Sequence, residues 1–317
     1  MHGAVRRDRF DRGRRSSFAF ASVLVLSCTS ASAQGDEPPL EPIGAEAFEV
    51  LRDLYEYDTD VPLECRTVHR LEEPEYVREK LVFRGIRDSR VPALLAVPKG
   101  GEGPYPCVIL LHGIGGSKEG WWRDGSSHSG RLLTERLLRS GHAVLTLDAP
   151  YHGERIASND FESADVFLLQ RGWMQRARDM VVQSVVEHRR AIDVLAARDD
   201  IDPSRLGVVG YSMGGMLAFM LTAIEPRIEA SVACVTPILS DSYSAMSVHN
   251  YAPRISRQPF LMLMAEADAM NYTEARARRL YSLIAAADKE VHFYQGGHVL
   301  PAEWVERAAE WVESRLR

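Results

Sequence analysis

The chain has 317 residues, 45% of them apolar and 26% charged, which is enough material to bury one large hydrophobic core. Its formal net charge is −6, but residues 1–33 carry six arginines against two aspartates, which leaves about −10 on the remainder. A protein this acidic lacks the basic surface that nucleic-acid binding requires, so we expect no nucleic-acid partner.

The first 33 residues show the three regions of an export signal. An arginine-rich start precedes an apolar run at residues 18–26 and the small-residue cleavage motif Ala31-Ser32-Ala33. The run is too short for a stable membrane anchor. We therefore predict a signal peptide at residues 1–33 and an exported protein, periplasmic or secreted, with no stable membrane span after cleavage. An amphipathic or disordered N-terminal extension and a lipid anchor on Cys28 are the alternatives.

A proline-rich tether is predicted for residues 34–44 and a single domain for residues 45–317. The domain begins with one helix-like stretch and then extended segments that end in Val91–Val97. This pattern is typical of antiparallel strands at the edge of a sheet.

After Pro106 the sequence alternates between short apolar runs and amphipathic segments. Continuous apolar runs separated by helices indicate parallel strands that are covered on both faces, and six alternations predict a doubly wound sheet. One stretch, residues 156–175, does not fit this pattern and is expected to be a small insertion over the site. The runs are at residues 107–111, 143–147, 206–209, 231–235, 260–264 and 291–294, and the clearest helices cover residues 180–195 and 304–312.

The strongest motif is a nucleophile elbow. Gly210-Tyr211-Ser212-Met213-Gly214 follows a predicted strand and precedes a helical pattern, and Gly-x-Ser-x-Gly in this context places a serine on a tight strand-to-helix turn. Side chains at the two glycines would collide with the neighbouring strand and helix. The motif therefore predicts that Ser212 is a catalytic nucleophile.

A serine hydroxyl needs a base to remove its proton and a carboxylate to orient that base. His298 follows Gln295-Gly296-Gly297 just beyond the last predicted strand, where catalytic groups gather in open α/β sheets, whereas His292 lies within the strand. We predict His298 as the base. Glu266 and Asp268 both follow the preceding strand, and Asp268 is preferred as the acid because it lies deeper in the loop.

The remaining site predictions concern the oxyanion hole and the pocket. Backbone N–H groups of Met213, after the nucleophile, and of Ile114, in a glycine-rich loop after an earlier strand, are predicted to stabilise the oxyanion. Trp121, Trp122 and Tyr211 are candidate substrate-binding residues. No cysteine or histidine spacing indicates a metal site, and Cys107 and Cys234 are expected to be buried thiols.

These motifs together resemble one branch of a known superfamily. His112–Gly116, Asp148–Gly153, the elbow, Asp268 and Gly297-His298 are similar, in this order, to the dienelactone hydrolase-like and acyl esterase branch of the α/β-hydrolase superfamily. The resemblance covers roughly residues 76–317. It implies the α/β-hydrolase fold, with a mostly parallel doubly wound sheet, antiparallel N-terminal lead-in strands and a small insertion near the site.

The resemblance also implies ester or lactone hydrolysis with no cofactor, on a small-molecule ester substrate. In the related enzymes the segment corresponding to Asp148–Gly153 shapes the turn behind the site, so His152 is expected to be structural. Dienelactone hydrolase has a cysteine at the elbow, where this chain has Ser212. A carboxylesterase is therefore favoured over an enzyme for dienelactone.

Two other function classes stay open at this point. One is a peptidase or amidase of the prolyl oligopeptidase-like type, although residues 34–105 leave no room for the propeller domain that such enzymes usually carry. The other is a noncatalytic binding protein on a hydrolase scaffold, which has no need of a complete triad. The sequence gives no indication of the oligomeric state.

Overall fold

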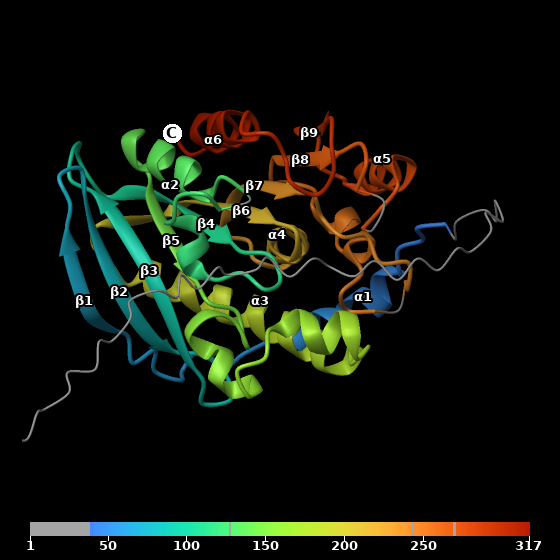
Figure 1. Cartoon of the computed structure of the whole chain (residues 1–317), viewed down its shortest axis with the longest axis horizontal. Coiled ribbons are helices and arrows are strands. Elements are labelled where there is room, and N and C mark those ends of the chain that lie inside the picture. The colour runs from blue at the N-terminus through green and yellow to red at the C-terminus, as the bar shows by residue number, and fades with distance from the viewer. Residues whose placement is uncertain (1–38, 127, 243, 269–270) are drawn as a thin grey trace, which may run out of the picture. The chain divides into compact units, whose positions relative to one another are not determined.

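The computed structural model describes residues 39–317 except 127, 243 and 269–270, and its strands form a nine-stranded sheet in the order β1-β2-β3-β5-β4-β6-β7-β8-β9 (Figure 1). Residues 1–38, which include the predicted signal peptide, lie outside the described residues. The strands are β1 (Arg66–Glu72), β2 (Tyr76–Arg84), β3 (Arg90–Pro98), β4 (Tyr105–Leu111), β5 (Ala143–Leu147), β6 (Ile201–Tyr211), β7 (Ile228–Cys234), β8 (Phe260–Ala265) and β9 (Lys289–Tyr294).

The directions of the strands divide the sheet into two parts. Strand β2 pairs antiparallel with β1 on one side and with β3 on the other, and β3 pairs antiparallel with β5. From β5 to β9 every neighbouring pair is parallel. The predicted fold, a mostly parallel sheet with antiparallel lead-in strands, is therefore confirmed. Because the parallel strands end at one edge, the loops that follow them meet there.

The helices cover both faces of the sheet (Figure 1). Alternate residues of β4 explain why its apolar run is continuous: Val108 and Leu110 pack on one face, and Ile109 and Leu111 on the other. The face with Val108 and Leu110 is covered by helices α2 (Gly130–Arg139) and α6 (Trp304–Arg315). The face with Ile109 and Leu111 is covered by helices α1 (Ala45–Arg52), α3 (Met174–Ala196), α4 (Met213–Ile224) and α5 (Glu274–Leu283).

The predicted insertion folds into short helical turns at the carboxyl edge of the sheet. A 3-10 helix covers Gly153–Asn159 and a π-helical turn covers Val166–Gln170, with Phe167 fully buried. A Cβ built on Gly115, in the glycine-rich loop after β4, would lie 3.5 Å from the Ser163 hydroxyl. The insertion therefore packs against the loop that is predicted to form the oxyanion hole. Further 3-10 helices cover Asp53–Tyr55, Lys118–Trp121, Val248–Asn250 and Ala252–Arg254.

The last residues of the predicted tether pack onto the domain. Leu40 is buried, and the Ile43 N–H donates to Asn250 Oδ1 at 3.1 Å. Cys107 and Cys234 are buried free thiols, as predicted, and burial raises the pKa of both. Within the part of the chain that the structure describes, no helix is long and apolar enough to cross a membrane.

Candidate active site

Ser212 occupies a strained turn between β6 and α4. Its backbone angles are φ 58° and ψ −118°, outside the regions that L-residues ordinarily adopt. Its N–H donates to the Cys234 carbonyl at 2.9 Å, and α4 begins with the next residue, Met213. Such strain persists only where the surroundings fix the backbone, and here it lifts one hydroxyl to the edge where the loops meet.

The two glycines of the elbow lie against backbone atoms. A Cβ on Gly210 would come within 2.0 Å of the Gly214 carbonyl oxygen, and a Cβ on Gly214 within 2.0 Å of the Leu111 carbonyl oxygen. These atoms belong to the main chain of α4 and β4 and have no side-chain freedom to move away. The close approach of strand, turn and helix at Ser212 therefore requires glycine at both positions.

His298 links the serine to a carboxylate. Its Nε2 lies 2.9 Å from Ser212 Oγ, and its Nδ1 lies 2.6 Å from Asp268 Oδ2. Asp268 follows β8 and is 4% exposed, so its carboxylate fixes the proton of the neutral imidazole on Nδ1 and leaves Nε2 to accept the serine proton. Glu266 is exposed. The geometry joins the three residues that were predicted as nucleophile, base and acid.

The sequence did not indicate a contribution from Asn271. Its side-chain amide donates to Asp268 Oδ1 at 2.7 Å, which occupies the carboxylate oxygen that His298 does not use. Its backbone carbonyl accepts from the Ile238 N–H, so the acid loop is also tied to the loop after β7. Nothing in the local pattern of residues marks this asparagine, because its role depends on where two loops meet.

The glycine-rich loop after β4 lies directly beside the nucleophile. A Cβ on Gly113 would lie 3.2 Å from Ser212 Cβ and 3.8 Å from its Oγ, so a side chain there would crowd the serine. The first N–H groups of a helix have no partner within that helix, and Met213 opens α4. The structure thus brings the loop that carries Ile114 and the N-terminus of α4 together at Ser212. Oxyanion binding by Ile114 and Met213 stays a prediction.

Buried neutral histidines support this loop. His112 Nε2 accepts from the Ala149 N–H at 3.1 Å, so its Nδ1 is the nitrogen that donates to the Gly113 carbonyl at 2.8 Å. The ring of His152 lies 4.9 Å from that of His112, and its Nδ1 bonds to the Pro150 carbonyl. Burial lowers the pKa of His112 to about 4 and that of His152 to about 3. Both side chains therefore brace the turn as neutral groups, as expected for His152.

A buried ion network anchors the far end of the same loop. Lys118 is fully buried, and its Nζ lies 2.8 Å from Asp148 Oδ2, 2.6 Å from Glu154 Oε1 and 2.7 Å from Glu119 Oε1. Its backbone N–H also donates to Asp148 Oδ1. Burial opposes the charge, but Asp148 and the hydrogen bonds outweigh it and raise the pKa of Lys118. The network ties the loop to the end of β5.

The predicted pocket residues lie within the protein. Trp121 is fully buried, with its ring 4.7 Å from that of His128, which leaves no face open to a substrate. Trp122 is half-buried, and its Nε1 donates to Thr146 Oγ1 on β5 at 3.2 Å. Tyr211 is 6% exposed, and its hydroxyl bonds to the main chain of the His298 loop. In this structure the rings of Trp121 and Tyr211 are buried, and the ring of Trp122 packs against Tyr76 and Arg78 on β2.

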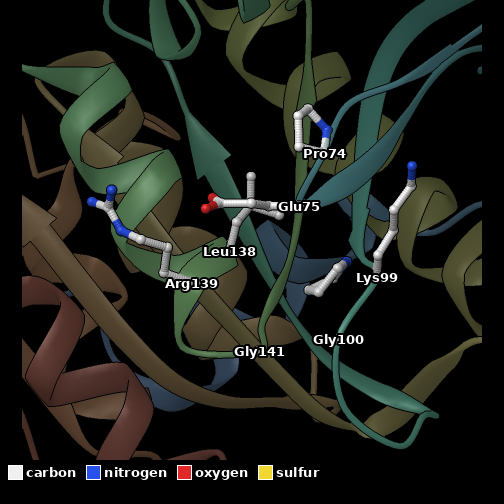
Figure 2. A pocket seen from close by; sticks show the side chains of 8 residues that line it. Pro74, Glu75, Lys99, Gly100, Leu138, Arg139 and Gly141 are labelled. Atoms are coloured by element: carbon white, nitrogen blue, oxygen red, sulfur yellow. The ribbon is translucent and has the colours of Figure 1, made fainter.

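The structure also contains a cavity of about 510 Å³ at the opposite edge of the sheet (Figure 2). The turn after β1, the end of β3 and the end of α2 line it, so it lies near the amino ends of β4 and β5. Its ionisable lining residues are Glu75, Lys99 and Arg139, which include neither a nucleophile nor a base paired with one. Among residues 39–317, apart from the four that are not described, no group of three or more His, Cys, Asp or Glu could hold a metal ion.

Comparison with known proteins places the chain in a family. Residues 48–265, which are more than half of the chain, match the acetyl xylan esterase (AXE1) family. The chain belongs to the acetyl xylan esterase family. The matched range includes the glycine-rich loop and Ser212, and it ends before Asp268 and His298.

Individual relatives and solved structures extend the comparison. The chain is 27% identical over 175 residues to the "Putative hydrolase YtaP" of Bacillus subtilis, covering 54% of this chain and 56% of that protein. It is 26% identical over 211 residues to "Esterase YjfP" of Escherichia coli, covering 63% of this chain and 76% of that protein. The solved acetyl xylan esterase of Paenibacillus sp. R4 is 19% identical with a TM-score of 0.68, covering 88% of this chain and 98% of that one.

These findings confirm the predicted branch of the α/β-hydrolase superfamily. The identity to the solved structure is low, so that likeness establishes the fold, and the family match carries the chemistry. The prediction of an enzyme that acts on carboxylic esters is confirmed at the level of the acetyl xylan esterase family. The chain spans about half the length of YtaP.

Proposed function

We propose that this chain is an exported serine carboxylesterase that hydrolyses small-molecule esters through an acyl-enzyme on Ser212. The observation that carries the proposal is the hydrogen-bonded chain from Ser212 Oγ through His298 to the buried carboxylate of Asp268, at 2.9 and 2.6 Å. These contacts have the geometry that general-base activation of a serine needs. A complete set of this kind, beside a glycine-rich loop, favours a catalyst over a noncatalytic binding protein.

The chemistry proceeds in two steps. The Ser212 hydroxyl attacks the ester carbonyl while His298 Nε2 takes its proton, and the histidine then gives that proton to the leaving alcohol. Asp268 stabilises the imidazolium that forms between these events. Water next attacks the acyl-enzyme while His298 Nε2 takes its proton, and the histidine returns that proton to Ser212 Oγ as the bond to the acyl group breaks and the acid leaves. Backbone N–H groups at Met213 and Ile114 are proposed to stabilise the negative oxygen in both steps.

The family suggests acetyl groups on carbohydrates as the first substrates to assay. Proteins named acetyl xylan esterase are among the solved structures that share this fold. We propose a panel of p-nitrophenyl esters of increasing acyl length together with acetylated sugars. A p-nitroanilide in the same panel tests the peptidase alternative, because preferential anilide cleavage would contradict an esterase.

The first prediction concerns the two reacting side chains. Ser212→Ala and His298→Ala are each expected to reduce ester turnover about 10⁴-fold or more, since the first removes the attacking oxygen and the second removes the base that takes its proton. His292→Ala is the matched control, because His292 lies on β9 near the same loop and has no place in the hydrogen-bonded chain. Labelling with a fluorophosphonate should occur in the control and be lost in Ser212→Ala. Either triad variant retaining activity within about tenfold of wild type refutes the assignment.

The second prediction concerns export. The arginine-rich start, the apolar run and Ala31-Ser32-Ala33 support cleavage before Gln34. Mass spectrometry of protein from its native host should find Gln34 at the N-terminus, outside the cytoplasm. An intact Met1 terminus in the cytoplasm contradicts export, and a lipid on Cys28 would identify an anchored protein.

A further inference from the structure

The side chain of Tyr211, directly before the nucleophile, is packed inside the protein and points at the histidine loop. It is 6% exposed, and its ring centroid lies 5.7 Å from that of Trp304 and 5.3 Å from that of His128. The ring of His298 is 6.2 Å away. The body of Tyr211 is thus fixed by packing, and only its hydroxyl reaches the loop that carries His298.

The Tyr211 hydroxyl makes two hydrogen bonds whose directions are determined. It lies 2.8 Å from the His298 carbonyl oxygen, which only accepts, and 2.9 Å from the Leu300 N–H, which only donates. The hydroxyl therefore donates to one and accepts from the other. Burial raises the pKa of Tyr211, which favours the protonated hydroxyl that donates this hydrogen bond.

The histidine loop has few other attachments. Gly296 adopts a left-handed φ of +110°, and its carbonyl accepts from the Ala267 N–H at 2.9 Å. Val299 is 57% exposed, and the His298 side chain is 38% exposed. Packing therefore fixes this segment far less than it fixes the elbow. The hydroxyl of Tyr211 bridges the main chain on both sides of Val299.

We propose that Tyr211 is a positioning residue, whose hydroxyl holds the backbone at His298 so that Nε2 stays within reach of Ser212 Oγ. This inference rests on the proposed function, in which His298 is the base. Tyr211 is bonded through the chain to Ser212 and through its side chain to the histidine loop. Tyr211 thus helps to position both residues of the 2.9 Å contact between Ser212 Oγ and His298 Nε2.

The test is Tyr211→Phe, which removes one oxygen atom and keeps the packed ring. We expect kcat to fall about tenfold or more with KM within about twofold, because misplacing a base by an ångström slows proton transfer without changing substrate contacts. The rate of fluorophosphonate labelling should fall by the same factor. Tyr55→Phe is the matched control: Tyr55 is fully buried, and its hydroxyl also donates to a main-chain carbonyl, that of Ala245. Both variants should melt at similar temperatures, and only Tyr211→Phe should lose kcat.

A double mutant separates positioning from direct contact with the substrate. If Tyr211 acts only through His298, adding Tyr211→Phe to His298→Ala should leave the residual turnover unchanged within about twofold. A further tenfold loss in that background overturns the inference, as does a wild-type kcat for Tyr211→Phe alone. An active His298→Ala enzyme would instead refute the proposed function, so the two failures are distinguishable.

Discussion

The nucleophile and its base are held in different ways. At Ser212 the main chain is confined by other main chain: Gly210 and Gly214 lie against backbone atoms, and the Ser212 N–H bonds to β7. At His298 the main chain crosses the surface, and it is held by the Tyr211 hydroxyl and by the Asp268 carboxylate on the imidazole. The position of Ser212 is fixed by close packing of main-chain atoms, whereas the position of His298 depends on a few polar side chains.

This difference predicts where the enzyme is sensitive to substitution. Changes at the elbow should act on folding, because backbone atoms have nowhere to move. Changes around the histidine should act on turnover while the fold survives, because the loop is exposed and carries little of the core.

The largest effect that separates the two regions is expected at the acid. Asp268→Asn should lower turnover on the order of 10³- to 10⁴-fold, because the amide stabilises the wrong tautomer of His298 and leaves the imidazolium without a counter-charge. The free energy of unfolding should change far less than activity does. Glu266→Gln, two residues away and exposed, is the control and should cost less than about tenfold. Measurement of kcat for both variants decides the assignment, and the reverse ranking would transfer the role to Glu266.

A pair of glycine substitutions compares the two regions directly. Gly214→Ala should reduce the free energy of unfolding by about 3 kcal/mol or more, since its Cβ would overlap the Leu111 carbonyl. Gly297→Ala, beside His298, should cost less than about 1 kcal/mol, because its Cβ would lie at an ordinary 3.6 Å from the Ala267 carbonyl. Urea denaturation measures both. Equal losses would show that the histidine loop is packed as tightly as the elbow.

The sequence predicts the elbow well because its determinants are contiguous. Strand, glycines, serine and helix occupy residues 206–220. At each of these glycines a Cβ atom would lie too close to a neighbouring atom in the structure. His298 and Asp268 could also be placed, since parallel strands deliver their following loops to one edge. The structure pairs His298 with Asp268, a choice that alternation along the strand could not make.

The surroundings of the site could not be predicted in the same way. Trp121, Trp122 and Tyr211 were expected in the pocket because they adjoin the catalytic motifs, but adjacency in sequence does not determine the side to which a ring turns. Asn271 and the Lys118 network depend on contacts between loops that are distant along the chain. Such contacts leave no period or spacing in the sequence.

The last prediction uses pH to test whether three buried histidines stay neutral in the folded protein. His112, His152 and His188 are at most 4% exposed, and burial lowers the pKa of His112 and His188 to about 4 and that of His152 to about 3. Between those values and the ordinary 6.5, the unfolded chain binds protons that the folded chain does not. The contribution of these neutral histidines to the free energy of unfolding is therefore fully present above about pH 6.5 and is lost as the pH falls towards 4.

A single variant isolates one of these protons. His188 lies on α3, away from the reacting atoms, and its Nδ1 donates to the Ser184 carbonyl. His188→Gln should reduce the slope of unfolding free energy against pH by about 1.4 kcal/mol per pH unit between pH 6 and 4.5, which corresponds to one proton. His69→Gln, at an exposed histidine on β1, should leave the slope unchanged. The slopes come from urea denaturation at stepped pH. An unchanged slope in His188→Gln would mean that this histidine takes up its proton in the folded protein. The surroundings of His188 on α3 would then be more accessible to water than its burial indicates.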